Sequence, residues 1–210
     1  QKIITSPINQ CAEKLSITNI KTPDNLNTQK EYEFIKKLNV NLVLVVAYGK
    51  IIPKNILDIP NVCFVNIHAS ILPKWRGAAP IQRAIMNMDK ETGISIMKIE
   101  KELDSGPVMK FSKINISKDC NYESLSKRLS ILAASIIVGA LDTIENKKEK
   151  FVPQDHKKAT YAKKIEKAEA KINWNDTAEN IVAKINAFNP NPGSWFSLNG
   201  IRIKVIKAKE

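Results

Sequence analysis

The spacing of hydrophobic residues changes along the chain between a helical period and a strand-like period, which predicts an α/β protein. Segments in which apolar residues recur every three or four positions, or which a proline opens, are expected to be helices. They are 7–15, 28–38, 53–57, 79–88, 121–146 and 177–188. Short runs rich in β-branched and aromatic residues are expected to be strands. They are 17–20, 42–47, 62–66, 93–99, 108–116, 195–198 and 201–206.

The character of these strands predicts how the sheet is built. The run 42–47 is apolar throughout, which is typical of a strand buried on both faces in a parallel sheet covered by helices. Segments 93–99 and 108–116 are expected to pair as a hairpin. A second hairpin is expected around Asn199 and Gly200, a dipeptide typical of tight turns. The predicted fold is therefore an α/β doubly wound sheet with flanking helices.

Composition describes an ordinary globular protein and excludes several classes. The chain has 210 residues, of which 43% are hydrophobic and 26% charged, and this is enough for a sizeable core. Its three cysteines form no CxxC pair, which argues for a reducing compartment and against disulfides or a zinc site. With two histidines, the sequence offers no metal-ligand cluster. Neither a membrane-length apolar run nor a signal peptide is expected, so the predicted location is cytoplasmic.

Positive charge is concentrated in the second half of the chain. The formal net charge is +12, of which residues 106–210 carry +8. Such a surface suits contact with the phosphate backbone of a nucleic acid. A lysine-rich face that is merely solvated gives the same count, so charge alone leaves both interpretations open.

A candidate catalytic set lies at the end of the strand expected at 62–66. Asn66 and His68 are two positions apart, so they point to the same side of a strand, and α/β sheets bind ligands beyond such strand ends. An amide donor beside an imidazole suits stabilisation of an oxyanion and proton transfer. Asp104, in a turn that follows the next helix and strand, completes the set. Each residue alone also has a structural explanation, because turn aspartates and strand-end histidines are common.

Four short motifs carry a resemblance that covers essentially the entire chain. They are Ala47-Tyr48-Gly49, Asn66-Ile67-His68-Ala69-Ser70-Ile71-Leu72-Pro73, Trp75-Arg76-Gly77-Ala78-Ala79-Pro80-Ile81-Gln82-Arg83 and Leu103-Asp104-Ser105-Gly106. Together they resemble the folate-dependent formyltransferases, a family with a Rossmann-like sheet. The Asn-x-His and Leu-Asp-x-Gly motifs are similar to those of the whole family, whereas the run from Arg76 to Arg83 resembles the members that act on methionyl-tRNA.

The resemblance implies a reaction and a role for each motif. The expected reaction moves a formyl group from 10-formyltetrahydrofolate to the amino group of initiator methionyl-tRNA for translation initiation, without a metal. Asn66 and His68 are expected to donate hydrogen bonds to the oxyanion, and Asp104 to orient and charge His68 and to help remove the amine proton. The residues expected to contact folate are Ser70, Ile71, Leu72, Pro73, Ala47, Tyr48, Gly49 and Leu103. Those expected to contact the other substrate are Arg76, Gly77 and Arg83. The protein is expected to act as a monomer, without a membrane.

The same resemblance implies a division of the chain. Residues 1–150 are expected to form a formyltransferase catalytic domain that lacks its N-terminal βαβ unit. Residues 151–174 are expected to form a basic linker, and residues 175–210 the beginning of a truncated OB-type β-barrel. The turn around Asp104 departs from the family pattern, because Glu102 and Pro107 stand where glycine and an acidic residue are common.

Two other functions stay open. Formyltransferases that act on glycinamide ribonucleotide or amino-sugar nucleotides share the folate-site motifs, but they are not expected to carry the run from Arg76 to Arg83. A non-catalytic RNA-binding module made from the basic second half would tolerate changes at Asn66 and would use Trp174 and Trp195 as stacking platforms. A dinucleotide-binding Rossmann protein is disfavoured, because the chain contains no GxGxxG.

Overall fold

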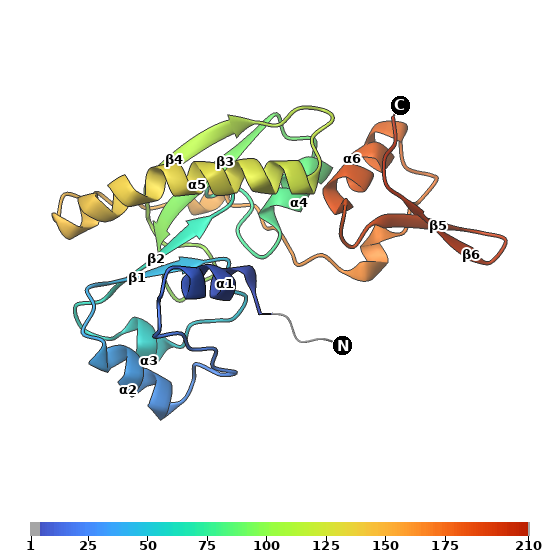
Figure 1. Ribbon diagram of the computed structural model, residues 1–210. Coiled ribbons are helices and arrows are strands. Elements are labelled where there is room, and N and C mark those ends of the chain that lie inside the picture. Colours follow the sequence, from blue (N-terminus) through green and yellow to red (C-terminus); the bar gives the residue numbers. More distant parts are fainter. Residues whose placement is uncertain (1–4, 210) are drawn as a thin grey trace. The chain divides into compact units, whose positions relative to one another are not determined.

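The computed structural model describes residues 5–209, and in it the chain divides into two compact units (Figure 1). The first unit comprises the chain up to residue 40 together with residues 51–59. The second comprises residues 41–50 and everything from residue 60 onward. Every residue of the candidate site belongs to the second unit.

The first unit contains three helices, α1 (Pro7–Lys14), α2 (Gln29–Lys37) and α3 (Lys54–Leu57), all of which the sequence predicted. The hydroxyls of Ser6 and Thr28 accept hydrogen bonds from backbone N–H groups in the first turns of α1 and α2, and such caps satisfy donors that a helix start leaves free. The predicted strand at 17–20 is wrong. Its isoleucines are exposed and it pairs with no described strand, and the N–H groups of Ile17 and Ile20 donate to the nearby carbonyl oxygens of Ala12 and Thr18.

The second unit is built on a four-stranded sheet in the order β1-β2-β3-β4. Its strands are β1 (Leu42–Val46), β2 (Cys63–His68), β3 (Glu91–Lys98) and β4 (Val108–Asn115). Only β1 and β2 are parallel, whereas β2–β3 and β3–β4 are antiparallel. The predicted hairpin of β3 and β4 is therefore confirmed, and the sheet is mixed rather than wholly parallel.

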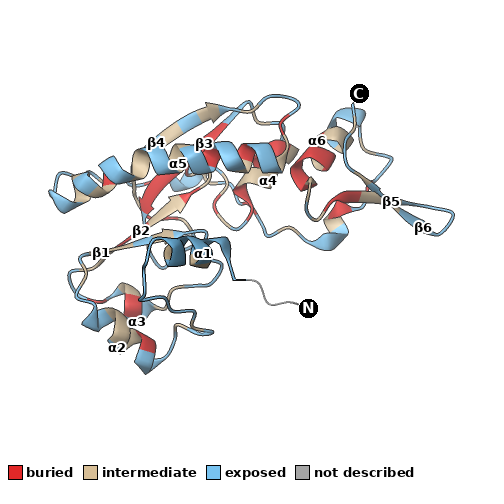
Figure 2. Cartoon of the chain, in the orientation of Figure 1, coloured by how far each residue is buried: buried red, intermediate tan, exposed pale blue. Residues whose placement is uncertain are grey.

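Burial differs sharply among these strands. The prediction that the run 42–47 is buried on both faces is wrong, because β1 is an edge strand and its Leu44 and Val46 side chains are exposed. The continuously buried strand is β3, in which residues 92–97 are all buried (Figure 2). The centre of the core thus lies on the antiparallel part of the sheet.

Helices α4 (Pro80–Met86) and α5 (Tyr122–Glu145) contribute side chains to this core. Leu125 and Leu129 of α5 are fully buried with Ile94 of β3 and Phe188, and α5 lies along one face of the sheet (Figure 1). Burying a leucine side chain contributes about 1.5–3 kcal/mol, so α5 anchors the sheet. Among the described residues, α5 is also the one helix long and apolar enough to cross a membrane, by length and composition alone. The expectation that no apolar run reaches that length was therefore wrong, although the core helix of a globular protein meets the same criteria.

Residues 151–174 follow α5 and contain two short 3-10 helices, η1 (His156–Lys158) and η2 (Lys167–Ala170). This segment is partly buried, since the side chains of Gln154, Ala162, Ala170 and Ile172 lie inside the protein. It also pairs with the loop before α4, where Arg76 and Tyr161 form a parallel bridge. The segment therefore contributes to the site described below.

The end of the chain forms helix α6 (Ala178–Phe188) and the hairpin of β5 (Ser194–Leu198) and β6 (Ile201–Val205). Asn199 and Gly200 both have positive φ angles, of 50° and 78°, as a two-residue type I′ turn requires. The sequence prediction of helix, hairpin and turn is confirmed here. The OB-type barrel stays a prediction, because these two strands form a separate two-stranded sheet.

Candidate active site

The end of β2 places two of the three predicted catalytic residues. Asn66 and His68 share one face of the strand, and the antiparallel register puts His68 opposite Ser95 of β3. His68 is buried, with 5% of its surface exposed. Because β2 is held between β1 and β3, both side chains project from a strand that is fixed on both edges.

Asp104 lies beside both of them, in the turn that connects β3 to β4. Its Oδ2 atom accepts a hydrogen bond from the backbone N–H of Gly77 at 2.8 Å and lies 3.6 Å from His68 Nδ1. Its Oδ1 atom lies 3.5 Å from Asn66 Nδ2, at the limit of a hydrogen bond. The structure therefore brings together the three side chains that the sequence singled out, across 38 residues of chain.

The second ring nitrogen of His68 defines its protonation pattern. Nε2 lies 2.8 Å from the carbonyl oxygen of Trp75, which only accepts hydrogen bonds, so Nε2 carries a proton. In the neutral ring Nδ1, which faces Asp104, is then unprotonated, and in the imidazolium it also carries a proton. A histidine held in this way can donate from Nδ1 only when both ring nitrogens carry a proton.

The loop from Ser70 to Arg76 is held by buried hydroxyl groups. Ser95 Oγ donates to the Ser70 carbonyl oxygen at 2.7 Å and accepts from the Leu72 N–H at 3.1 Å. Ser70 Oγ donates to the Lys74 carbonyl oxygen at 2.6 Å. The loop also contains a cis peptide bond between Leu72 and Pro73. These contacts fix the Trp75 carbonyl that His68 needs.

Gly77 sits where only glycine fits well. Its φ angle is +114°, and a Cβ atom there would lie 2.8 Å from the carbonyl oxygen of Ala162. That neighbour is backbone and cannot move aside as a flexible side chain can. Segment 151–174 therefore presses directly on the loop that carries the N–H donor to Asp104.

Arg76 lies inside the protein rather than on the surface of a substrate cleft. It is 2% exposed, and its Nε and Nη2 atoms donate to Gln154 Oε1 at 3.0 and 2.7 Å. Gln154 in turn donates from Nε2 to the carbonyl oxygens of Asp104 and Gly106. Sequence reasoning missed Gln154, because a lone glutamine in a lysine-rich segment gives no periodic or motif signal.

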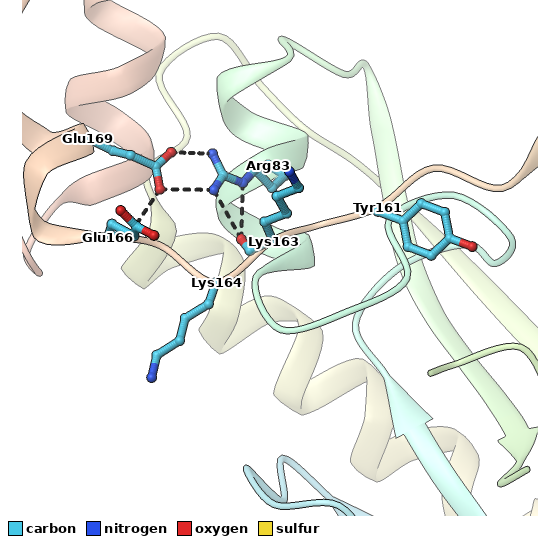
Figure 3. Close-up of a pocket in the computed structure, with 6 residues that line it drawn as sticks. All are labelled: Arg83, Tyr161, Lys163, Lys164, Glu166 and Glu169. Atoms are coloured by element: carbon cyan, nitrogen blue, oxygen red, sulfur yellow. Dashed lines mark hydrogen bonds and ion pairs between the residues drawn. The ribbon is translucent and has the colours of Figure 1, made fainter. Parts of the chain in front are cut away.

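Arg83 lies at the rim of a cavity of about 450 Å³ that Tyr161, Lys163, Lys164, Glu166 and Glu169 also line (Figure 3). Its guanidinium donates to both carboxylate oxygens of Glu169, at 2.7 and 3.1 Å, and to the Lys163 carbonyl oxygen. These hydrogen bonds hold the pKa of Glu169 below its ordinary value. The side chain of Lys164 points away from this ion pair (Figure 3). The pair ties α4 to η2, so Arg83 already has a carboxylate partner.

The residues predicted to contact folate lie at two places. Ile71, Leu72 and Pro73 line a cavity of about 310 Å³, whereas Ser70 is fully buried. Residues 47–49 follow β1, and because Val46 pairs with Ile67, Ala47 comes next to the end of β2. Leu103, beside Asp104, is 64% exposed. Ile71, Leu72 and Pro73 therefore form a cavity wall. Residues 47–49 and Leu103 lie near the end of β2, where the catalytic residues are.

Two other kinds of site receive no support from the geometry. Within residues 5–209, no group of three or more His, Cys, Asp or Glu side chains is arranged to hold a metal ion. Cys63 lies on β2 near the site, but burial raises the pKa of its thiol. A raised pKa makes a thiol a poor nucleophile at neutral pH, so Cys63 is a weak candidate for a catalytic nucleophile.

Comparison with known proteins identifies the family. Residues 4–141 match the formyl transferase family, and residues 164–210 match the formyl transferase C-terminal domain. The whole chain is 53% identical to a methionyl-tRNA formyltransferase from Pelagibacter ubique and spans 67% of that protein.

Solved structures share the fold at lower identity. The methionyl-tRNA formyltransferase from Clostridium thermocellum superposes with a TM-score of 0.71 at 21% identity, over 96% of this chain and 86% of that one. HypX from Aquifex aeolicus, solved in complex with tetrahydrofolic acid, has a TM-score of 0.71 at 18% identity, over 84% of this chain and 30% of that one. With 53% identity over its full length to a curated relative, and with its Asn66, His68 and Asp104 side chains together, the chain belongs to the methionyl-tRNA formyltransferase family.

Proposed function

We propose that this protein transfers a formyl group from 10-formyltetrahydrofolate to the amino group of methionyl-tRNA. The observation that carries the proposal is the meeting of Asn66, His68 and Asp104 at the end of β2, in a chain 53% identical to a methionyl-tRNA formyltransferase. An amide, an imidazole and a carboxylate at one point suit acyl transfer to an amine, because that reaction needs an oxyanion stabiliser and a proton acceptor.

In this proposal each catalytic side chain has one task. The amine nitrogen attacks the formyl carbon, and the carbon–nitrogen bond to folate N10 breaks when N10 takes up the proton that the amine has given up. Asn66 and His68 donate hydrogen bonds to the formyl oxygen as it becomes negative. Asp104 orients His68 and accepts the amine proton through a water. Each oxyanion donor contributes on the order of 10²- to 10³-fold in rate.

The folate co-substrate is proposed to lie beside the catalytic residues, at the carboxyl ends of β1 and β2. A pterin ring has apolar faces and a hydrogen-bonding edge, and the exposed side chains of Tyr48 and Leu103 offer apolar contacts there. The backbone of residues 47–49 is open, since a Cβ atom on Gly49 would meet nothing within 4 Å. The tetrahydrofolic acid bound to HypX supports a folate on this fold, but its 18% identity supports no residue assignment.

The acceptor is proposed to be a tRNA, which the net charge of +12 suits. Lys163 and Lys164 line the cavity beside Arg83, and neither forms an ion pair with a carboxylate within residues 5–209. Direct substrate contact by Arg76, Gly77 and Arg83 stays a prediction, with Arg76 the weakest candidate because it is buried. We expect a monomer that acts in the cytoplasm with initiator methionyl-tRNA.

The test is an acceptor panel. The 210-residue chain, and a chimera that adds the flanking segments of the Pelagibacter relative, would receive 10-formyltetrahydrofolate with methionyl-tRNA, glycinamide ribonucleotide or an amino-sugar nucleotide. His68→Ala serves as the inactive control. Formylation of methionyl-tRNA alone, lost in that control, is the expected result.

The other outcomes separate the alternatives. Formylation of a sugar nucleotide or of glycinamide ribonucleotide instead would keep the folate site and reject the tRNA acceptor. A folded chain and chimera that formylate nothing, yet bind tRNA equally well with and without His68→Ala, would favour the non-catalytic RNA-binding module.

A further inference from the structure

Gln154 uses the full hydrogen-bonding capacity of its side chain inside the protein. Its Nε2 donates to the carbonyl oxygens of Asp104 and Gly106 at 2.9 and 2.6 Å, and its Oε1 accepts two hydrogen bonds from Arg76. A primary amide has two donor hydrogens and two acceptor lone pairs. All four are satisfied here, and only 8% of the residue is exposed.

The two carbonyls that Gln154 holds define the turn that carries Asp104. Asp104 has a positive φ angle of 48°, a left-handed conformation that is uncommon outside glycine and that aspartate adopts more readily than most residues. Within the turn, the Ser105 N–H reaches the Glu102 carbonyl oxygen at a long 3.4 Å. The contacts from Gln154, on either side of Ser105, are shorter and come from outside the turn.

Arg76 closes this arrangement into a ring. Its guanidinium is fixed by Gln154 and lies 3.4 Å from His156 Nδ1, and among the described residues it forms no ion pair with a carboxylate. The next residue, Gly77, donates its N–H to Asp104 Oδ2. Gln154 therefore holds the backbone carbonyl of Asp104, and Gly77 holds its carboxylate. Arg76 links these two contacts, because it is bonded to the Gln154 side chain and directly precedes Gly77 in the chain.

We propose that Gln154 is a positioning residue for formyl transfer, which aims the Asp104 carboxylate at His68 by fixing the backbone of the Asp104 turn. The proposal rests on the proposed function and extends it to a residue outside the family motifs. It also assigns Arg76 to the support of Gln154 rather than to an anionic group of the substrate. Gln154 itself touches no reacting atom in this assignment.

Gln154→Glu tests the proposal with the smallest change of shape. The carboxylate still accepts from Arg76, but at neutral pH it has no hydrogens to give to the Asp104 and Gly106 carbonyl oxygens. Gln154→Asn, one methylene shorter, serves as a second variant if the first does not fold. The matched control is Gln10→Glu, because Gln10 also donates to a backbone carbonyl, that of Thr5, but on the surface of α1.

Two measurements separate positioning from mere stability. One is kcat and KM for methionyl-tRNA, taken per folded molecule at a temperature where circular dichroism shows each variant folded. The other is the amide resonance of Gly77 in a ¹H–¹⁵N NMR spectrum, which reports the carboxylate that its N–H contacts. Asp104→Asn gives the reference position of this resonance without the carboxylate charge.

The expected result is that Gln154→Glu lowers kcat by about 10- to 100-fold, changes KM for methionyl-tRNA less than about 2-fold, and moves the Gly77 resonance. Gln10→Glu should change none of these. A lower melting temperature with unchanged kcat and an unmoved Gly77 resonance would overturn the proposal, and would leave Gln154 as a structural residue. If the wild-type protein transfers no formyl group, the proposed function fails, while the Gly77 resonance still decides whether Gln154 positions Asp104.

Discussion

The carboxylate of Asp104 accepts a 2.8 Å hydrogen bond from the backbone N–H of Gly77, which lies 27 residues earlier in the chain. This contact joins the loop before α4 to the turn before β4. It also leaves the other carboxylate oxygen facing Asn66. A backbone donor cannot rotate away, so it fixes one oxygen and thereby orients the whole carboxylate toward His68.

Asp104→Asn should separate the charge of this side chain from its shape. The amide oxygen can still accept from Gly77, so stability should change by less than about 1 kcal/mol. Without the carboxylate there is no acceptor for the amine proton at this position, and kcat should fall by about 10²- to 10⁴-fold. Steady-state formylation and urea unfolding measure the two effects. The exposed Asp119→Asn is the control, and equal kcat in both variants would refute the role of Asp104.

Gly77→Ala should disturb the same contact through the backbone. The added Cβ atom would lie 2.8 Å from the Ala162 carbonyl oxygen at a φ angle of +114°, and strain of this kind costs about 1–3 kcal/mol. Gly139→Ala is the control, because Gly139 lies within α5 and a Cβ there meets nothing within 4 Å. That change should stabilise the protein by up to about 1 kcal/mol. Urea unfolding measures the free energy of unfolding of both variants. Changes of the same sign in Gly77→Ala and Gly139→Ala would contradict the steric argument.

The site was easier to predict from sequence than the environment that supports it. Strand periodicity predicted that Asn66 and His68 share a face, and the resemblance of the surrounding motifs to a known family assigned these two residues and Asp104 to catalysis. Gln154 could not be found in this way. It acts on Asp104 from a position 50 residues away through backbone carbonyls, which leave no trace in the residue pattern of the turn.

The errors in the fold prediction have a common physical origin. Apolar runs report that a segment is buried or paired, but they do not say by which partner. The run 42–47 does form a strand, yet it lies at a sheet edge and its Leu44 and Val46 side chains are exposed. The run 17–20 finds no pairing strand among the described residues. Helices and hairpins were predicted better, because their hydrogen bonds and caps are local in sequence.

Ser95→Ala should weaken the loop that carries the Trp75 carbonyl. The buried Ser95 hydroxyl donates to Ser70 and accepts from Leu72, so its removal leaves a buried N–H and a buried carbonyl unpaired. Each such group costs about 1–3 kcal/mol. The control is Ser130→Ala on α5, where the exposed hydroxyl bonds only to its own helix at Lys127, and stability should change by less than about 0.5 kcal/mol. Equal unfolding free energies for the two variants would show that the Ser95 hydroxyl does not hold the loop.

Acidification should weaken the ion pair of Arg83 and Glu169 in a defined direction. Hydrogen bonds from Arg83 lower the pKa of Glu169 in the folded protein, so the folded state binds fewer protons there than the unfolded state. The stabilisation is therefore complete above the ordinary pKa of a glutamate, and it is lost as the pH falls through the lowered value. The Glu169 side chain is 32% exposed, so the effect should be at most about 1 kcal/mol. Urea unfolding of the wild type and of Glu169→Gln from pH 7 down to pH 3 should give curves that converge in acid, whereas the exposed Glu145→Gln should run parallel to the wild type. If the difference in unfolding free energy between the wild type and Glu169→Gln stays constant with pH, the carboxylate charge does not join α4 to η2.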